Sequence, residues 1–291
     1  MGNARNCTGI VNPEVGDLAG LSSAFSGRAS GLLKTPSTSL QTQPISVTTL
    51  GESTVKIVPK KFKVHSLTGR INPQLMWLAF KAVKKNRGAA GLDKVSIKMF
   101  EKNLQQNLDA LMRELKSRTY KPIPLKRVYI PKGGGKLRPL GIPAVRCRIA
   151  QEVVRRLIEP IFEQLFHDNS YGFRPGRNCH MAVEKVLEYT NDGHKFVLDA
   201  DIKAFFDNIP HKLIMQCVAA QIADGNILGL IEKFLRSGVM DDGVFKPTTK
   251  GTPQGGVISP LLANIVLNYL DWQLHANRFK FVRYADDFVI T

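Results

Sequence analysis

The sequence contains few cysteines, and no pattern joins them. Cys7, Cys147, Cys179 and Cys217 lie far apart, and none of them forms a C-x-x-C pair. This spacing excludes the usual zinc patterns and gives no sign of a disulfide framework. We therefore expect a reducing, cytoplasmic setting.

The sequence also lacks a segment that could enter a membrane. No apolar run approaches the roughly 20 residues that a transmembrane helix needs. The N-terminus has no compact apolar stretch typical of a secretory signal, and Asn6 stands where an N-myristoylation signal carries Ser or Thr. We expect no membrane partner.

Acidic residues are scarce relative to basic ones. The 291 residues include 41 Lys and Arg against 24 Asp and Glu, which gives a net charge of +17. Residues 1–55 carry three basic and three acidic side chains, so the whole excess lies in residues 56–291. Such a charge favours a polyanionic partner, but a solubility surface and an acidic membrane are alternatives that charge alone leaves open.

Residues 1–55 differ from the rest of the chain in composition. They hold fifteen Ser and Thr residues, few aromatic residues and no apolar period. This composition is typical of a poorly ordered or irregular arm. A transit peptide is the alternative, against which Glu14 and Asp17 argue.

Helical and extended patterns alternate after this arm. Helical spacing of apolar residues is found over 75–83, 100–115, 149–158, 213–222, 227–235 and 261–270. Extended runs are expected over 124–131 and 137–143, joined by a glycine-rich hairpin tip, and over 279–284 and 288–291. Pro160 is expected to break its helix. The apolar run over 195–200 predicts a buried strand.

Three carboxylates stand where acidic residues are costly. Asp201 follows that apolar run, and Asp286 and Asp287 occupy the tip of an apolar hairpin. If the segments lie together, repulsion raises the pKa of at least one carboxyl group, and a divalent cation relieves it. Two Mg²⁺ ions about 4 Å apart would support an in-line nucleotidyl transfer. An ordinary hairpin turn is the simpler interpretation of an isolated Asp-Asp pair.

Five boxes follow one another along the chain. They are Y-I-P-K with K-L-R-P-L-G-I-P in 129–143, Y-G-F-R-P-G-R in 171–177, D-I-K-A-F-F-D-N-I in 201–209, K-G-T-P-Q-G-G-V-I-S-P-L-L-A-N-I in 250–265, and Y-A-D-D in 284–287. Their order resembles the reverse transcriptases of mobile group II introns, over about residues 70–291. The resemblance implies an α+β right-hand polymerase fold, with fingers over 56–195 and an antiparallel palm sheet flanked by helices over 196–291.

The resemblance also implies roles for individual residues. The catalytic, metal-binding carboxylates are Asp201, Asp286 and Asp287, with the backbone carbonyl of Ile202 as a further metal ligand. The dNTP-binding residues are Lys132, Arg138, Phe206, Gln254 and Gly255. The residues near template or RNA are Arg87, Arg174 and Arg177. The implied cofactor is Mg²⁺ as two ions, with Mn²⁺ as the alternative, and the Phe206 ring would exclude a ribonucleotide 2′-hydroxyl.

The implied function is RNA-directed DNA synthesis from dNTPs on an RNA template with a DNA primer. The implied second function is that of a maturase, which binds the group II intron RNA and assists its splicing, in a bacterium or an organelle. Alternatives are a reverse transcriptase of a retron, diversity-generating or defence system, a splicing cofactor without polymerase activity, and an RNA-dependent RNA polymerase, against which Phe206 argues. We expect a fragment without a thumb, and an exposed palm face would allow a homodimer.

Overall fold

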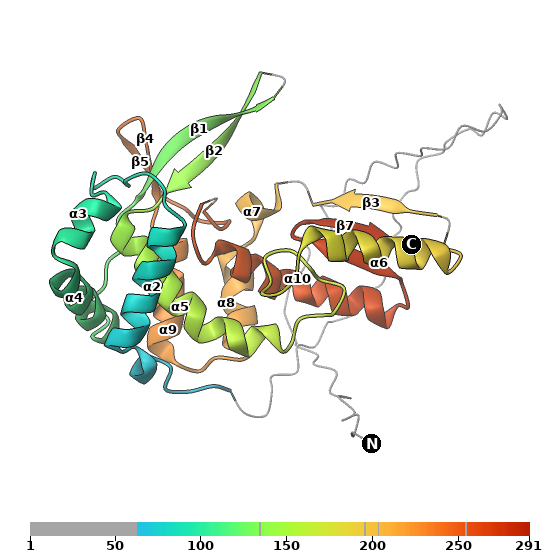
Figure 1. The fold of residues 1–291 in the computed structure, drawn as a ribbon, viewed down its shortest axis with the longest axis horizontal. Helices are drawn as coiled ribbons and strands as arrows, with labels where there is room; N and C mark the ends of the chain where they lie inside the picture. The colour runs from blue at the N-terminus through green and yellow to red at the C-terminus, as the bar shows by residue number, and fades with distance from the viewer. Residues whose placement is uncertain (1–62, 134, 195, 203, 254) are drawn as a thin grey trace.

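The computed structural model describes residues 63–133, 135–194, 196–202, 204–253 and 255–291. The arm predicted for residues 1–55 lies outside them. Helices and two separate sheets make up the described part of the chain (Figure 1). The predicted α+β class is confirmed.

One apolar core joins the main helices. These are α2 (Pro73–Lys85), α4 (Leu104–Lys116), α5 (Val145–Glu163), α8 (His211–Ala219), α9 (Gly225–Leu235) and α10 (Ser259–Ala276). Local signals set where they begin: the Asn72 side chain accepts the Leu75 N–H at 2.8 Å before α2, and Pro260 lies in the first turn of α10. None of the described helices is long and apolar enough to cross a membrane.

Two helix predictions differ from the structure. The period over 100–115 is divided at Asn103 into α3 (Ile97–Lys102) and α4. The predicted break at Pro160 is wrong, because α5 continues through it to Glu163. A proline removes one N–H donor from a helix, and the buried side chains of Ile158 and Phe162 hold the turns on either side of it against the core.

A four-stranded sheet carries the predicted fingers hairpin. Its strands are β1 (Leu125–Gly133), β2 (Lys136–Ile142), β4 (Val239–Asp241) and β5 (Val244–Lys246), in the order β2-β1-β4-β5. The β1–β2 hairpin is antiparallel as predicted and projects from the helices (Figure 1). The short β4–β5 hairpin was not predicted. It pairs in parallel with β1, and Asp241 accepts a hydrogen bond from the Tyr129 hydroxyl at 3.0 Å.

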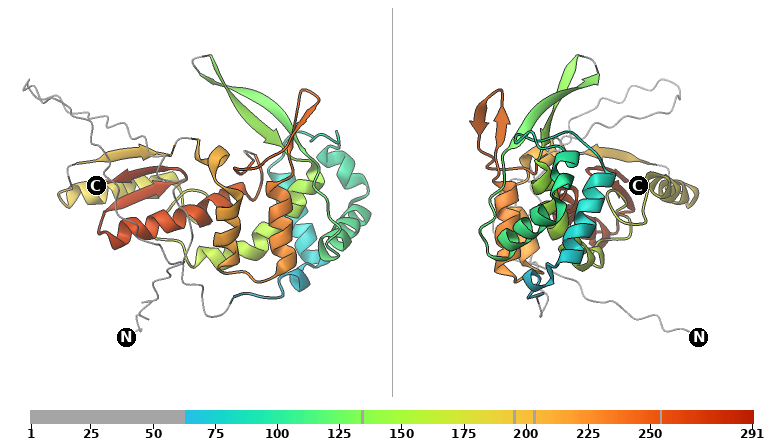
Figure 2. Two further views of the ribbon diagram at one scale, coloured as in Figure 1. Left: turned by 180° about the vertical axis from the view of Figure 1, so that it is seen from behind. Right: turned by 60° about the vertical axis from the view of Figure 1, so that its left-hand side comes forward.

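A three-stranded antiparallel sheet lies at the end of the molecule away from α3 and α4 (Figures 1 and 2). Its strands are β3 (Leu198–Asp201), β6 (Phe281–Tyr284) and β7 (Asp287–Ile290), in the order β3-β7-β6. Phe288 joins the main core on one face. On the other face Val282 packs with residues of α6 (Cys179–Asn191). The predicted antiparallel sheet flanked by helices is confirmed.

The strand predicted from the apolar run over 195–200 is exposed, so its predicted burial is wrong. β3 begins only at Leu198, which is 45% exposed, and Phe196 before it is 91% exposed. The strand pairs with β7 along one edge, and the described residues leave most of its side chains uncovered. Apolar composition alone does not predict whether another element covers the strand.

Candidate active site

The strand register brings the three predicted carboxylates to one end of the sheet. Asp201 at the end of β3 lies directly opposite Asp287 at the start of β7. Asp286 stands beside them in the two-residue turn between β6 and β7, because Tyr284 pairs with Asp287. Like charges directly opposite each other on paired strands are destabilising. The fold therefore places negative charge where it is costly.

The electrostatics of the turn reflect this crowding. Burial raises the pKa of the Asp286 carboxyl group, and repulsion from Asp201 raises it further. Burial also raises the pKa of Asp287, followed by repulsion from Asp286 and Asp201. Asp286 and Asp287 thus hold protons more readily than they would in water.

A metal ion would relieve this repulsion. Among the described residues, no three His, Cys, Asp or Glu side chains converge closely enough to enclose a metal by themselves. Mg²⁺ does not need such an enclosure, because it is usually held by one or two carboxylates with waters and substrate phosphates. The oxygen donors of Asp201, Asp286 and Asp287 fit this ion. The Ile202 carbonyl, the further predicted ligand, accepts a hydrogen bond from the Phe205 N–H at 3.1 Å.

The fingers hairpin contributes positive charge to this site. Arg138 is an exposed residue of β2. Its positive charge opposes, but does not cancel, the rise in the pKa of Asp286. One predicted triphosphate-binding residue is therefore near enough to act electrostatically on Asp286. Lys132 belongs to β1, but its side chain lies outside the described part of the chain, as does Gln254.

The residue predicted to select the sugar lies on the short helix α7 (Phe205–Asn208). Phe206 is half-buried, and its ring lies edge-on to Phe205 at 5.9 Å between centroids. Its carbonyl accepts the Thr252 N–H at 2.7 Å. Gly251 permits this approach, since a Cβ there would lie 2.7 Å from the Phe206 oxygen, and its φ is +79°. The segments predicted to surround a nucleotide are therefore in contact.

Gly255, predicted to bind dNTP, packs against the four-stranded sheet. A Cβ on Gly255 would lie 2.3 Å from the Gly141 carbonyl oxygen of β2, and φ at Gly255 is +103°. The absence of a side chain at Gly255 therefore allows close contact between two backbone segments of the protein. Gln151 of α5 supports the same loop, because its buried side-chain oxygen accepts the Val257 N–H at 2.7 Å. Sequence reasoning missed Gln151, which lies in no conspicuous motif.

The three arginines predicted near RNA have different environments. Arg87 is exposed, with a left-handed φ of +56°. Arg177 is half-buried and donates to the Asp168 carboxylate at 3.0 Å. Arg174 is buried and donates to the Glu163 carboxylate at 2.9 Å and to the Ser170 carbonyl at 2.8 Å. The Arg174 guanidinium group thus has its described partners inside the protein. Its predicted RNA contact stays a prediction.

An arginine that sequence reasoning overlooked, Arg148, supports the Arg87 loop. Arg148 of α5 is buried and donates to the carbonyls of Pro143, at 3.1 Å, and Arg87, also at 3.1 Å. It also donates to the Ala89 carbonyl. The exposed Arg87 side chain is thus presented by a loop whose backbone is held from behind.

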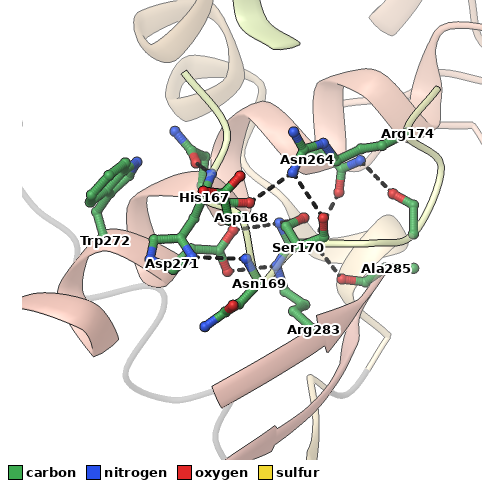
Figure 3. Close-up of polar contacts among 12 residues, drawn as sticks. His167, Asp168, Asn169, Ser170, Arg174, Asn264, Asp271, Trp272, Arg283 and Ala285 are labelled. Carbon is green, nitrogen blue, oxygen red and sulfur yellow. Dashed lines mark hydrogen bonds and ion pairs between the residues drawn. The ribbon is translucent and has the colours of Figure 1, made fainter. Parts of the chain in front are cut away.

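A buried polar cluster lies behind the turn formed by Ala285 and Asp286, called the aspartate turn below (Figure 3). Arg283 of β6 pairs with Asp271 of α10, and both side chains are completely buried. Asn264 and Ser170 complete the cluster with hydrogen bonds to Arg283 of 2.9 and 2.7 Å. None of these four residues was predicted to be functional. A charged residue inside the apolar run of β6 was the one signal that pointed to them.

Comparisons with known proteins agree with this arrangement. The family described as "Reverse transcriptase (RNA-dependent DNA polymerase)" matches residues 130–291, which is more than half of the 291-residue chain. Protein YkfC of Escherichia coli (strain K12) is 44% identical over 214 residues, which cover 71% of this chain and 56% of that protein. The group II intron-encoded protein LtrA of Lactococcus lactis subsp. cremoris is 37% identical over 217 residues, which cover 73% of this chain and 35% of LtrA.

The fold has relatives among solved structures. A chain of a partial Cas6-RT-Cas1–Cas2 complex superposes with a TM-score of 0.52 at 23% identity, over 77% of this chain and 37% of that one. At this identity the likeness concerns the fold alone. The present chain spans about half or less of the length of YkfC and LtrA. The resemblance drawn from the five boxes is confirmed, and the chain belongs to the reverse transcriptase family.

Proposed function

We propose that this chain catalyses RNA-templated DNA synthesis, in which a nucleotide passes from a dNTP to the 3′-hydroxyl of a DNA primer. The proposal rests on three acidic residues that lie at one end of the sheet. Asp201 faces Asp287, and Asp286 occupies the adjoining turn. Such an arrangement weakens the fold unless a cation neutralises it. Catalysis explains why the charges are there.

The proposed roles follow from side-chain chemistry. Asp201, Asp286 and Asp287 would hold two Mg²⁺ ions, which would supply Lewis-acid stabilisation of the negative charge on the attacking and leaving oxygens. Arg138 and Lys132 bind the triphosphate, Arg through its planar fork and Lys as a compact charge. Gln254 and Gly255 belong to the loop beside the nucleotide.

A second proposed function is binding of group II intron RNA to assist its splicing. It is supported by the charge of +17 and by the name of the relative LtrA, a group II intron-encoded protein. Exposed Arg87 and half-buried Arg177 are the candidate phosphate contacts. Binding through such contacts should weaken steeply as salt rises. We assign this activity to a reducing cytoplasm, since Cys147, Cys179 and Cys217 are free thiols.

Primer extension on an RNA template tests the polymerase proposal. The double variant Asp286→Asn Asp287→Asn should lose dNTP incorporation while its affinity for the primer–template stays within about twofold. Asp242→Asn, which changes an exposed turn aspartate outside the site, is the matched control and should retain incorporation. Incorporation by the double variant at the wild-type rate would refute the proposal.

A sugar-selectivity assay tests the role of Phe206. Phe206→Ala should increase the use of ribonucleotides relative to dNTPs, because the shorter side chain leaves room for a 2′-hydroxyl. Competition between dCTP and CTP on one template measures the ratio directly. An unchanged ratio in an active variant would remove Phe206 from the proposed nucleotide site.

A further inference from the structure

Arg283 is a charged residue in the centre of an apolar strand. Its side chain is fully buried. A guanidinium group has five N–H donors in a rigid planar fork, and all five are used. Two bonds reach the Asp271 carboxylate, at 2.7 and 2.6 Å, and single bonds reach Asn264, Ser170 and the Ala285 carbonyl.

These partners come from three parts of the chain. Asp271 and Asn264 lie on α10, and Ser170 lies in the loop before α6. The Ala285 carbonyl belongs to the aspartate turn itself and accepts a hydrogen bond from the Arg283 guanidinium group (Nη1) at 2.8 Å. The guanidinium group therefore connects the turn to the helix beneath the sheet, as Figure 3 shows.

The turn needs such a support because its backbone is unfavourable. Ala285 has a φ of +60°, a left-handed conformation that residues with a Cβ rarely adopt. The Ala285 backbone packs closely against Gly172, where a Cβ would lie 2.3 Å from the Ala285 nitrogen. Asn264 links the two supports, since it accepts from Arg283 and donates to the Gly172 carbonyl at 2.9 Å.

The loop behind the turn is also fixed to the strand. The Arg283 N–H donates to the Asn169 carbonyl, and the Arg283 carbonyl accepts the Tyr171 N–H, both at 2.9 Å. Arg174 donates to the Ser170 carbonyl at 2.8 Å and so extends the support one residue further. Strained conformations persist only where the surroundings determine them fully, and they gather at functional sites.

We infer that Arg283, paired with Asp271, is a positioning residue that fixes the left-handed turn at Ala285 and thereby the direction in which Asp286 and Asp287 present their carboxylates. Arg283 touches no substrate and acts through the turn. Its consequence for catalysis rests on the proposed polymerase function, but its effect on the turn and on cation binding does not.

The geometry explains why lysine could not replace it. Lysine keeps the charge but has three donors on a flexible stem, so it cannot reach two Asp271 oxygens, Asn264, Ser170 and Ala285 together. Arg283→Lys therefore tests geometry with the charge conserved. Ile231→Ala in α9 removes buried apolar contacts far from the turn and serves as the matched control for lost stability.

Two measurements on the complete 291-residue chain test the inference. Hydrogen exchange with mass spectrometry should show faster exchange in the peptide spanning 281–290 of Arg283→Lys, with α9 unchanged. Electron paramagnetic resonance should show Mn²⁺ binding weakened by about 10- to 100-fold, the usual effect of losing a group that orients metal ligands. RNA affinity should stay within about twofold of wild type.

Two outcomes would overturn the inference. One is a folded Arg283→Lys variant with wild-type exchange at 281–290 and wild-type Mn²⁺ affinity. Another is faster exchange throughout the chain with weakened Mn²⁺ binding in Ile231→Ala as well, which would mean that stability alone is responsible. If Arg283→Lys does not fold, Ser170→Ala removes a single bond to the guanidinium group, and the same local changes are expected on a smaller scale.

Primer extension, run beside these two measurements, separates this inference from the proposed function. A wild-type chain that binds Mn²⁺ through the turn but extends no primer would refute polymerase activity and leave the positioning role standing. An active chain whose Arg283→Lys variant keeps its turn and its Mn²⁺ affinity would do the reverse.

Discussion

The two sides of the aspartate turn treat charge in opposite ways. Behind the turn, the charge of Arg283 is completely buried and every donor has a partner. In front of it, Asp201 and Asp287 face each other with like charge, and burial and repulsion raise the pKa of Asp287. The closed side gives the turn its shape, and the open side supplies charge that a cation can bind.

Fold and function thus use charge differently on the two sides of the turn. A buried pair such as Arg283–Asp271 tolerates the loss of one partner poorly, since an unpaired charge remains in the interior. Crowded carboxylates behave in the contrary way, because losing one of them relieves repulsion. Substitutions on the two sides should therefore change stability in opposite directions.

The largest effect is expected behind the turn. Asp271→Ala leaves the Arg283 charge buried without its partner, which should cost about 3–5 kcal/mol of unfolding free energy. Urea unfolding of the purified chain measures the loss. The double variant Asp271→Leu Arg283→Met removes both charges and should recover most of it. An equal loss in the single and double variants would show that packing, and not charge pairing, accounts for the effect.

A close backbone approach should give the next largest effect. Gly172→Ala introduces a Cβ that would lie 2.3 Å from the Ala285 nitrogen, so the turn or the loop must move at a cost of about 1–3 kcal/mol. Gly229→Ala is the control, because a Cβ there meets nothing within 4 Å in the middle of α9. The control should be neutral or slightly stabilising. Equal unfolding free energies for the two variants would contradict the packing described for the turn.

In front of the turn a small gain in stability is expected. Asp201→Asn removes one of two like charges that face each other, which should add about 0.2–1 kcal/mol in EDTA. Asp242→Asn is the matched control, because Asp242 lies in an exposed turn of the other sheet. A loss of stability in Asp201→Asn would mean that the carboxylate has a stabilising partner in the metal-free chain.

The smallest effect concerns acid sensitivity beside the site. Burial lowers the pKa of His211 from its ordinary 6.5, and its Nε2 lies 2.9 Å from the Gly251 carbonyl. The unfolded chain therefore takes up the His211 proton at higher pH than the folded chain, so stability is lost as pH falls below 6.5. His211→Asn should reduce this loss, and His180→Asn, at an exposed position, should not. Parallel pH dependence in both variants would remove His211 as the cause.

Long periodic segments were predictable from the sequence. The helices around Leu111, Leu230 and Leu262 follow apolar spacing over several turns, and the β1–β2 hairpin follows two extended runs around a glycine-rich tip. The two shortest strands were not predictable. β4 and β5 have three residues each, and their position depends on pairing with the distant β1.

Side-chain environments were harder to predict than elements. Apolar residues before Asp201 indicated burial, but β3 is exposed because the described chain puts no element over most of it. Arg174 was predicted to lie near the template, and nothing in the sequence indicated that Glu163 and backbone carbonyls would be its described partners. The Arg283–Asp271 pair joins a strand to a helix, and nothing in the local sequence of either residue indicates the other.

We propose that the carboxylates in front of the turn form a cation site at the expense of stability. Urea unfolding of wild type and Asp201→Asn, each in EDTA and in saturating Mg²⁺, tests it most directly. We predict that the variant is the more stable protein in EDTA and that wild type becomes the more stable one in Mg²⁺, because only wild type gains binding free energy. Equal stabilisation of both proteins by Mg²⁺ would contradict the claim.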